Sequence, residues 1–179
     1  MASSIIHIAI AKKVLEKVKV TDQRDYFLGA IAPDIAKQIG LNRDISHFVI
    51  NSKVDIPNIN IFIRRYPYFK HNSFDLGYFT HLFADKIWFD EFLPNYIGNC
   101  SVKLLDGTIV PASPEEITQM IYADYTNLNI RVIEKYDLDL SLFYEEFKVP
   151  NTTISEIPVD KLDILINKMG ILIENSKIE

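Results

Sequence analysis

The chain has 179 residues, of which 48% are hydrophobic and 24% are charged, as in an ordinary globular protein. This length suffices to bury a core, so we expect a single domain over residues 1–179. The net charge of −5 argues against specific nucleic-acid binding, which needs a clustered cationic surface. It leaves a small phosphorylated substrate open, because a bound metal ion can supply local positive charge. Nothing in the sequence indicates an oligomeric state.

The sequence shows no recognisable targeting signal and contains a single cysteine. The single Cys100 excludes an internal disulfide and a cysteine-rich zinc site. The first residues lack the cationic and long apolar regions of a secretory signal. No apolar run approaches the roughly 20 residues that span a bilayer. We therefore expect a cytoplasmic protein without a transmembrane segment.

The start of the chain predicts two helices. Ser3 or Ser4 can cap a helix that runs to about Lys19. Four apolar residues at helical spacing form its expected inner face: Ile6, Ile10, Val14 and Val18. A second helix is expected over about residues 22–30, and it ends before Pro33 because proline disfavours helical backbone at the preceding residue.

The middle of the chain predicts a short helix and then a long one. Residues 57–66 form a helix bounded by Pro57 and Pro67. Residues 75–92 are the most hydrophobic segment, with apolar residues around most of the helical circumference. A helix of this kind is central and buried.

The last third predicts a small β-hairpin followed by two helices. Residues 101–111 read as a hairpin around an Asp-Gly turn. Ser113, followed by proline and two acids, starts a helix that runs to about Tyr136. A last helix follows Pro158. The fold class is therefore all-α, a multihelical single domain with a hairpin excursion.

Three histidines and two aspartates in the first half of the chain form a candidate metal site. They are His7, Asp34 in G-A-I-A-P-D, His47 in S-H-F, and His81 with Asp85 in G-Y-F-T-H-L-F-A-D. The spacing of His81 and Asp85 puts both on one face of the predicted central helix. Imidazole and carboxylate are the ligands that hold a hydrolytic metal ion.

Each of these residues also has an ordinary structural interpretation. A buried Asp85 needs a partner, which could be His81 or a cation from Lys86, Arg64 or Arg65 instead of a metal. A lone helical histidine such as His7 or His47 is more often structural than a ligand. Asp34 after proline is typical of a turn or a helix cap.

Two further residues are weaker candidates. Asp124 shares a predicted helical stripe with apolar residues and is expected to point inward, as a ligand or as a carboxylate paired with Tyr or Lys. His71 could reach the cleft because the chain turns just before the central helix, although an exposed loop histidine is the simpler interpretation. Aromatic residues would wall the cleft or pack in the core: Phe48, Tyr78 and Trp88.

The order of these motifs resembles the zinc-dependent phospholipase C family and its relatives among the fungal zinc nucleases. The resemblance covers about the first half of the chain, and G-x-x-x-P-D and G-Y-x-x-H-x-x-x-D are its most specific parts. It implies an all-helical fold that cleaves phosphoesters with zinc. Asp34, His47, His81 and Asp85 would surround one zinc, and Asp85 would bridge to a second zinc that His7 also binds. Asp34 would be a ligand, a general base, or both.

The chain also departs from that family. Secreted members begin at a tryptophan whose amine binds metal, whereas this chain begins with Met1. No histidine follows His81, so the third zinc site of the family is absent. The resemblance therefore implies one or two divalent ions, zinc foremost. The closer match is to small intracellular bacterial members.

The sequence thus predicts a metal-dependent hydrolase of phosphoester bonds. One alternative is a non-catalytic helical module that binds metal or a partner. Another is a His-Asp phosphohydrolase, a class that needs an adjacent His-Asp dipeptide, which is absent here. Asp124 is the only feature that favours this last alternative.

Overall fold

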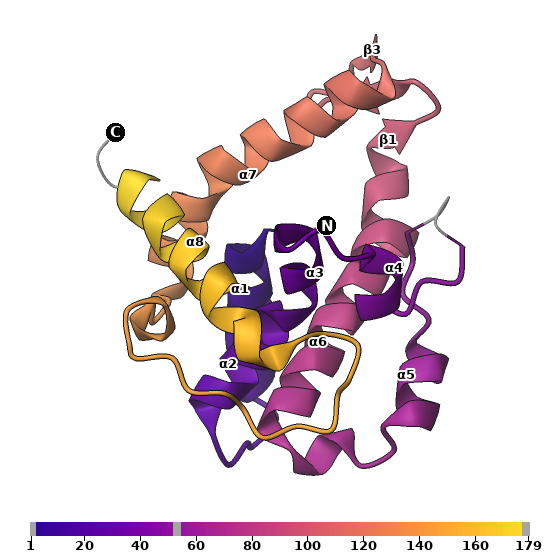
Figure 1. Cartoon of the computed structure of the whole chain (residues 1–179). Coiled ribbons are helices and arrows are strands. Elements are labelled where there is room, and N and C mark those ends of the chain that lie inside the picture. Colours follow the sequence, from indigo (N-terminus) through magenta and orange to yellow (C-terminus); the bar gives the residue numbers. More distant parts are fainter. Residues whose placement is uncertain (1–2, 52–54, 177–179) are drawn as a thin grey trace.

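The computed structural model describes residues 3–51 and 55–176. It is mostly helical and carries a small three-stranded antiparallel sheet (Figure 1). The predicted helical fold with a hairpin excursion is therefore confirmed at this level. Within the described residues, no helix combines the length and the apolar character needed to cross a bilayer.

Short helices dominate the first half of the chain and lead to one long central helix. These elements are α1 (Ser4–Leu15), α2 (Gln23–Ile31), η1 (Ala32–Asp34), α3 (Ile35–Gln38), α4 (Arg43–Ser46), α5 (Ile59–Arg65), η2 (Phe69–His71) and α6 (Ser73–Ile87).

A small sheet and two long helices make up most of the second half. The elements are the π-helical turn η3 (Trp88–Phe92), η4 (Leu93–Asn95), β1 (Ile97–Gly98), β2 (Ser101–Lys103), β3 (Ile109–Pro111), α7 (Pro114–Tyr136), η5 (Ser141–Phe143), η6 (Val159–Lys161) and α8 (Leu162–Ser176).

Helices α2 and α6 cross at two glycines and form the centre of the fold. A Cβ atom on Gly77 would lie 2.0 Å from the carbonyl oxygen of Tyr26, and one on Gly29 would lie 2.1 Å from that of Phe74. Any side chain at either position would therefore force the two backbones apart. Gly29 and Gly77 are the first residues of the two motifs that carry Asp34 and the His81–Asp85 pair. Because neither glycine has a side chain, α2 and α6 can pack closely, which brings Asp34 near His81 and Asp85.

Helix α1 buries a different face from the predicted one. It begins after Ser3, whose hydroxyl accepts from the amide of Ile6, and it ends at Leu15 rather than near Lys19. Its buried positions are Ser4, Ile5, His7, Ile8, Ala9 and Ala11. The predicted face was wrong because α1 is apolar on several sides. The actual rotation places the small alanines and His7 against the body of the protein.

Helix α2 starts after its cap Asp22 and ends at Ile31, close to the predicted bounds. The predicted reason for this end is wrong, because Ala32 before Pro33 keeps helical backbone, with φ of −56° and ψ of −38°, and the chain continues directly into η1. Helix α5 starts at Ile59, capped by Asn58, so it begins two residues after Pro57. It ends at Arg65, just before Tyr66 and Pro67.

The central helix α6 is buried along its first part and then leaves the body of the protein. Phe74, Tyr78 and Leu82 are fully buried, whereas 40% of Ile87 and 43% of Phe92 are exposed. The register changes at the π-helical turn η3, so the apolar residues beyond Ile87 do not continue the buried face. The prediction of a helix buried all round is therefore wrong, because Phe83, which precedes this turn, is already 46% exposed.

The predicted hairpin is present, with Val102 of β2 opposite Val110 of β3, and β1 adds a third strand. Helix α7 has the predicted start, with a reciprocal capping box between Ser113 and Glu116. Figure 1 shows that α6 and η3 lead up to the sheet and that α7 runs back from it toward α8. The Lys12 ammonium of α1 donates to the carbonyl of Tyr136 at 2.8 Å and ties down the far end of α7.

Candidate metal centre

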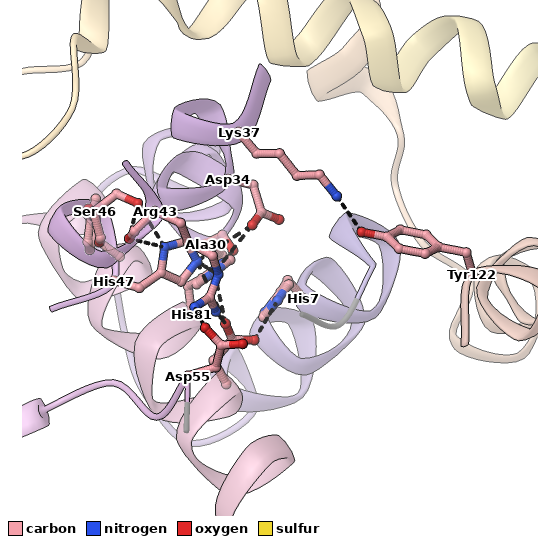
Figure 2. A network of polar contacts seen from close by, with 12 residues as sticks. His7, Ala30, Asp34, Lys37, Arg43, Ser46, His47, Asp55, His81 and Tyr122 are labelled. Atoms are coloured by element: carbon pink, nitrogen blue, oxygen red, sulfur yellow. Dashed lines mark hydrogen bonds and ion pairs between the residues drawn. The ribbon is translucent and has the colours of Figure 1, made fainter. Parts of the chain in front are cut away.

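The structure brings together five predicted ligands from four separate elements. They are Asp85 of α6 and four residues labelled in Figure 2, namely His7 of α1, Asp34 of η1, His47 just after α4 and His81 of α6. All five are buried, and Asp34 is the most exposed of them at 5%. Two overlapping groups could hold a metal ion, one of His7, Asp34 and His81 and the other of His47, His81 and Asp85.

The distances between these atoms suit donors that share one ion. The Nε2 atom of His47 lies 3.2 Å from that of His81, and it lies 3.6 Å from Oδ1 of Asp34. Asp85 Oδ2 lies 3.7 Å from Nε2 of His47 and 3.9 Å from Nε2 of His81. Two ligands bound tetrahedrally at about 2.0–2.2 Å lie roughly 3.3–3.6 Å apart. The observed spacing is therefore close to that of a coordination shell.

Hydrogen bonds at Nδ1 determine the tautomers of two of the imidazoles, those of His81 and His47. Nδ1 of His81 lies 2.8 Å from the carbonyl oxygen of Ala30, which can only accept, so this nitrogen carries the proton. Nδ1 of His47 lies 2.8 Å from the hydroxyl oxygen of Ser46, and that hydroxyl donates to the carbonyl of Arg43. Both Nε2 atoms therefore present lone pairs to the cluster, as metal-ligating histidines do.

Several buried polar atoms in the cluster have no hydrogen-bond partner among the described residues. These are both ring nitrogens of His7 and one oxygen each of Asp34 and Asp85. His7 stacks on His81 with ring centroids 3.8 Å apart, and its Nε2 lies 3.4 Å from Oδ1 of Asp85. Buried polar atoms without partners are costly and uncommon. A bound cation could be coordinated by one ring nitrogen of His7 and by the two carboxylate oxygens, so the residues fit a metal ion.

The charge states suit a cation as well. Burial raises the pKa of Asp34, but the neighbouring His81 and His47 outweigh it and hold that pKa below its usual value. The pKa of Asp85 is lowered strongly by His7 and His81, again against the effect of burial. Burial and the neighbouring His7 lower the pKa of His81 to about 3. At neutral pH the carboxylates are therefore ionised and His81 is neutral, the state in which these groups bind metals.

Arg43 is a functional residue that the sequence did not reveal. Its Nη2 donates to Oδ2 of Asp85 at 2.8 Å, and its Nη1 lies 3.2 Å from Oδ1 of Asp55. The carbonyl of Arg43 also accepts from Nδ1 of His47 at 3.2 Å. One residue thus orients two of the candidate ligands, through its side chain and through its main chain.

Two of the cations considered as alternative partners of Asp85 pair with other carboxylates. Lys86 pairs with Asp90 at 2.7 Å. Arg65 pairs with Glu156. Helix geometry explains why Lys86 is directed away, since neighbouring residues on a helix do not face each other.

The weaker candidates lie outside both groups of ligands. Asp124 is exposed, so the prediction that it points inward is wrong. The inward position belongs to the next residue, Tyr125, which is 6% exposed and packs against Trp88 with ring centroids 6.1 Å apart. His71 is exposed in η2 and is also absent from both groups.

The aromatic residues expected at the cleft divide into two kinds. Phe48 and Tyr78 are buried core residues, and the Tyr78 hydroxyl donates to the carbonyl of Ser46 at 2.5 Å. Phe48 has a left-handed backbone with φ of 56°. It ends α4 directly after His47, where a residue with a side chain carries a backbone cost of about 1–2 kcal/mol. Trp88, by contrast, is half-buried and packs against Phe92 and Tyr125.

Helix α7 lies close to the centre on the side away from α4. Figure 2 shows Lys37 of α3 reaching the hydroxyl of Tyr122, to which its ammonium group donates. Burial and the charges of Asp85 and Asp34 raise the pKa of Tyr125 well above its usual value. Tyr125 therefore shares its surroundings with the two carboxylates.

Fold and site together define a helical protein with a buried cluster of histidines and aspartates that could hold a metal ion. Comparison of the chain with known proteins gives no further assignment, since no family model, no curated protein and no solved structure matches it significantly.

Proposed function

We propose that the protein is a metal-dependent hydrolase of phosphoester bonds. The observation that carries this proposal is the convergence of Nε2 of His47 and of His81 on two ionised carboxylates in a buried site. His7 adds a third imidazole, and its ring nitrogens have no hydrogen-bond partner among the described residues. The order of motifs, which resembles the zinc-dependent phospholipase C family, supports the choice of phosphoesters.

The donor set favours zinc and a single ion. Three imidazoles and two carboxylates suit zinc, although other first-row divalent ions accept the same donors. Both groups of ligands include His81, and its one available Nε2 can bind one ion only. We therefore propose one ion per chain where the family resemblance allowed two.

The residues of the site suggest how hydrolysis would proceed. A bound divalent ion would supply Lewis-acid chemistry and stabilise negative charge on a phosphoryl group. Oδ1 of Asp34 has no hydrogen-bond partner among the described residues, and Asp34 is the most exposed of the five. Its lowered pKa keeps it ionised, so it can orient a water molecule and accept its proton.

A non-catalytic metal-binding protein is the second candidate, and one observation favours it. His47, His81 and Asp85 are fully buried, and structural zinc sites are closed in this way. The His-Asp phosphohydrolase alternative has lost its only support, because Asp124 is exposed and lies outside the ligand groups.

The test combines metal content with turnover. The purified protein is loaded with zinc, manganese or iron, dialysed, and assayed on a panel of phosphomonoesters and phosphodiesters. His81→Ala is the test variant, and His71→Ala is a matched control because His71 is exposed outside the site. We expect about one ion per chain and metal-dependent turnover, both lost in His81→Ala. Metal without turnover on any substrate would favour the non-catalytic protein, and no metal at all would refute both.

A further inference from the structure

A groove of about 660 Å³ lies between α7, the sheet and the turn η3. It occupies the angle that Figure 1 shows between α7 and the segment leading from α6 to β1. Its lining is apolar apart from Lys103, Asp124, Asn127 and Arg131. A volume of this size suits a small organic ligand.

A row of aromatic rings in contact with one another lines this groove. The ring of Tyr96 lies 5.0 Å from that of Phe92, which lies 4.6 Å from that of Trp88. The ring of Trp88 also packs against that of Tyr125, with ring centroids 6.1 Å apart. These four residues all line the groove. Ring faces arranged in this way favour another flat ring, which can stack or meet them edge to face.

The end of the row at Trp88 lies close in the chain to the candidate metal centre. Trp88 follows Asp85 by three residues, which is less than one turn of helix. Its indole Nε1 is buried and has no hydrogen-bond partner among the described residues. Because an indole N–H only donates, an oxygen acceptor on a ligand would satisfy it.

We propose that this groove binds the aromatic part of the substrate, so that the substrate is a phosphoester of an aromatic alcohol. The ring lies among Trp88, Phe92 and Tyr125, the indole N–H of Trp88 donates to a ligand oxygen, and the phosphoryl group faces Asp34 and Asp85. Hydrolysis breaks the bond between phosphorus and the aryl oxygen, with water supplying the new oxygen on phosphorus and the proton on the released alcohol. This inference rests on the proposed function for the hydrolytic step, whereas the binding itself does not.

Trp88 provides a direct readout, because it is the only tryptophan in the chain. The zinc-loaded protein is titrated with benzylphosphonate, with hexylphosphonate of comparable size, and with inorganic phosphate, while tryptophan emission is followed. Calorimetry measures the same affinities independently. We expect benzylphosphonate to change the emission and to bind about tenfold more tightly than hexylphosphonate. Equal or tighter binding of hexylphosphonate would overturn the aromatic assignment.

Three variants locate the binding. Phe92→Ala removes an exposed ring of the row and is expected to weaken benzylphosphonate binding about tenfold. Tyr144→Ala removes a ring that is 50% exposed and is not among the groove residues, so binding should not change. Trp88→Phe, measured by calorimetry, keeps a ring but loses the N–H and should weaken binding by a smaller factor. Equal affinity in Phe92→Ala and Tyr144→Ala would refute the groove.

The outcomes also separate this inference from the proposed function. Aromatic-selective binding without hydrolysis of phenyl phosphate would refute the hydrolase and keep the groove. Hydrolysis with no preference for aromatic esters would refute the groove and keep the hydrolase. Self-association that protects Trp88 from an external quencher would show that a second copy of the chain occupies the groove, which also refutes a ligand there.

Discussion

The Nε2 atoms of His47 and His81 lie 3.2 Å apart, and their Nδ1 atoms are directed at the hydroxyl of Ser46 and at the carbonyl of Ala30, respectively. Two lone pairs that face each other in a buried site repel unless something positive lies between them. Both carboxylates next to them, Asp34 and Asp85, have a lowered pKa and are ionised at neutral pH. This arrangement therefore suits a bound cation, and the predictions below follow from it.

Acid should destabilise the metal-free protein. The native pKa of His81 is about 3, against 6.5 for an ordinary histidine, so below pH 6.5 the unfolded chain binds a proton that the native site does not. The stability that depends on neutral His81 is therefore complete above pH 6.5 and is lost as the pH falls toward 3, by up to about 1.4 kcal/mol per pH unit. The lowered pKa values of Asp34 and Asp85 act in the same direction at still lower pH.

Urea denaturation between pH 7.5 and 4.5, with a chelator present, measures this loss. His81→Gln has no titrating ring at that position, so its stability should fall less steeply over the same range. A free energy of unfolding that stays constant or rises on acidification would contradict the neutral, buried state of His81.

Removal of the Arg43 side chain should weaken both the fold and the metal site. Arg43→Met leaves the buried Asp85 without its cation, which is expected to cost about 3–5 kcal/mol of stability. Loss of a residue that orients a ligand typically lowers metal affinity about 10- to 100-fold. Zinc competition assays and denaturation measure the two effects. Asp55→Asn changes only the half-exposed partner of Arg43 and should have a much smaller effect.

The conservative change Arg43→Lys separates charge from geometry. A lysine keeps the positive charge but cannot span Asp85 and Asp55 as the guanidinium does. We expect it to restore most of the stability and only part of the zinc affinity. If Arg43→Met bound zinc as tightly as the unaltered protein, Arg43 would have no role in positioning Asp85.

Gly77→Ala should disrupt the crossing of α2 and α6. The new methyl group would lie 2.0 Å from the carbonyl oxygen of Tyr26, so the helices must separate. Overpacking against backbone is expected to cost about 3 kcal/mol or more. It should also loosen the bond from His81 to the carbonyl of Ala30. Gly170→Ala is the comparison, because its nearest neighbour would be 3.3 Å away and a small change in stability is expected. Thermal unfolding that is equal for the two variants would contradict this crossing.

The sequence predicted the parts of the site that local spacing determines. His81 and Asp85 share a helical face whatever surrounds the helix, and the cap at Ser113 depends on neighbouring residues only. The glycines of both motifs were visible in the sequence as well. Their role as the contact between α2 and α6 needed the three-dimensional arrangement.

Features that depend on distant residues could not be predicted. Arg43 lies 42 positions before Asp85, and nothing in the sequence singles it out among the cations. The buried face of α1 was predicted wrongly because apolar residues occur on several sides of this helix. Asp124 and Tyr125 differ by one position, and packing against Trp88 decides which of them faces inward.

Nitrogen NMR of the four histidines tests the central claim most directly. The chain offers an internal reference, because His71 is exposed and lies outside the site. In the metal-free protein, His47 and His81 should each carry their proton on Nδ1. On addition of zinc, their Nε2 signals and the ring signals of His7 should shift together and reach completion at about one ion per chain, while His71 stays unchanged. Rings of His47 and His81 that carry the proton on Nε2, or that do not respond to zinc, would contradict a metal centre at this site.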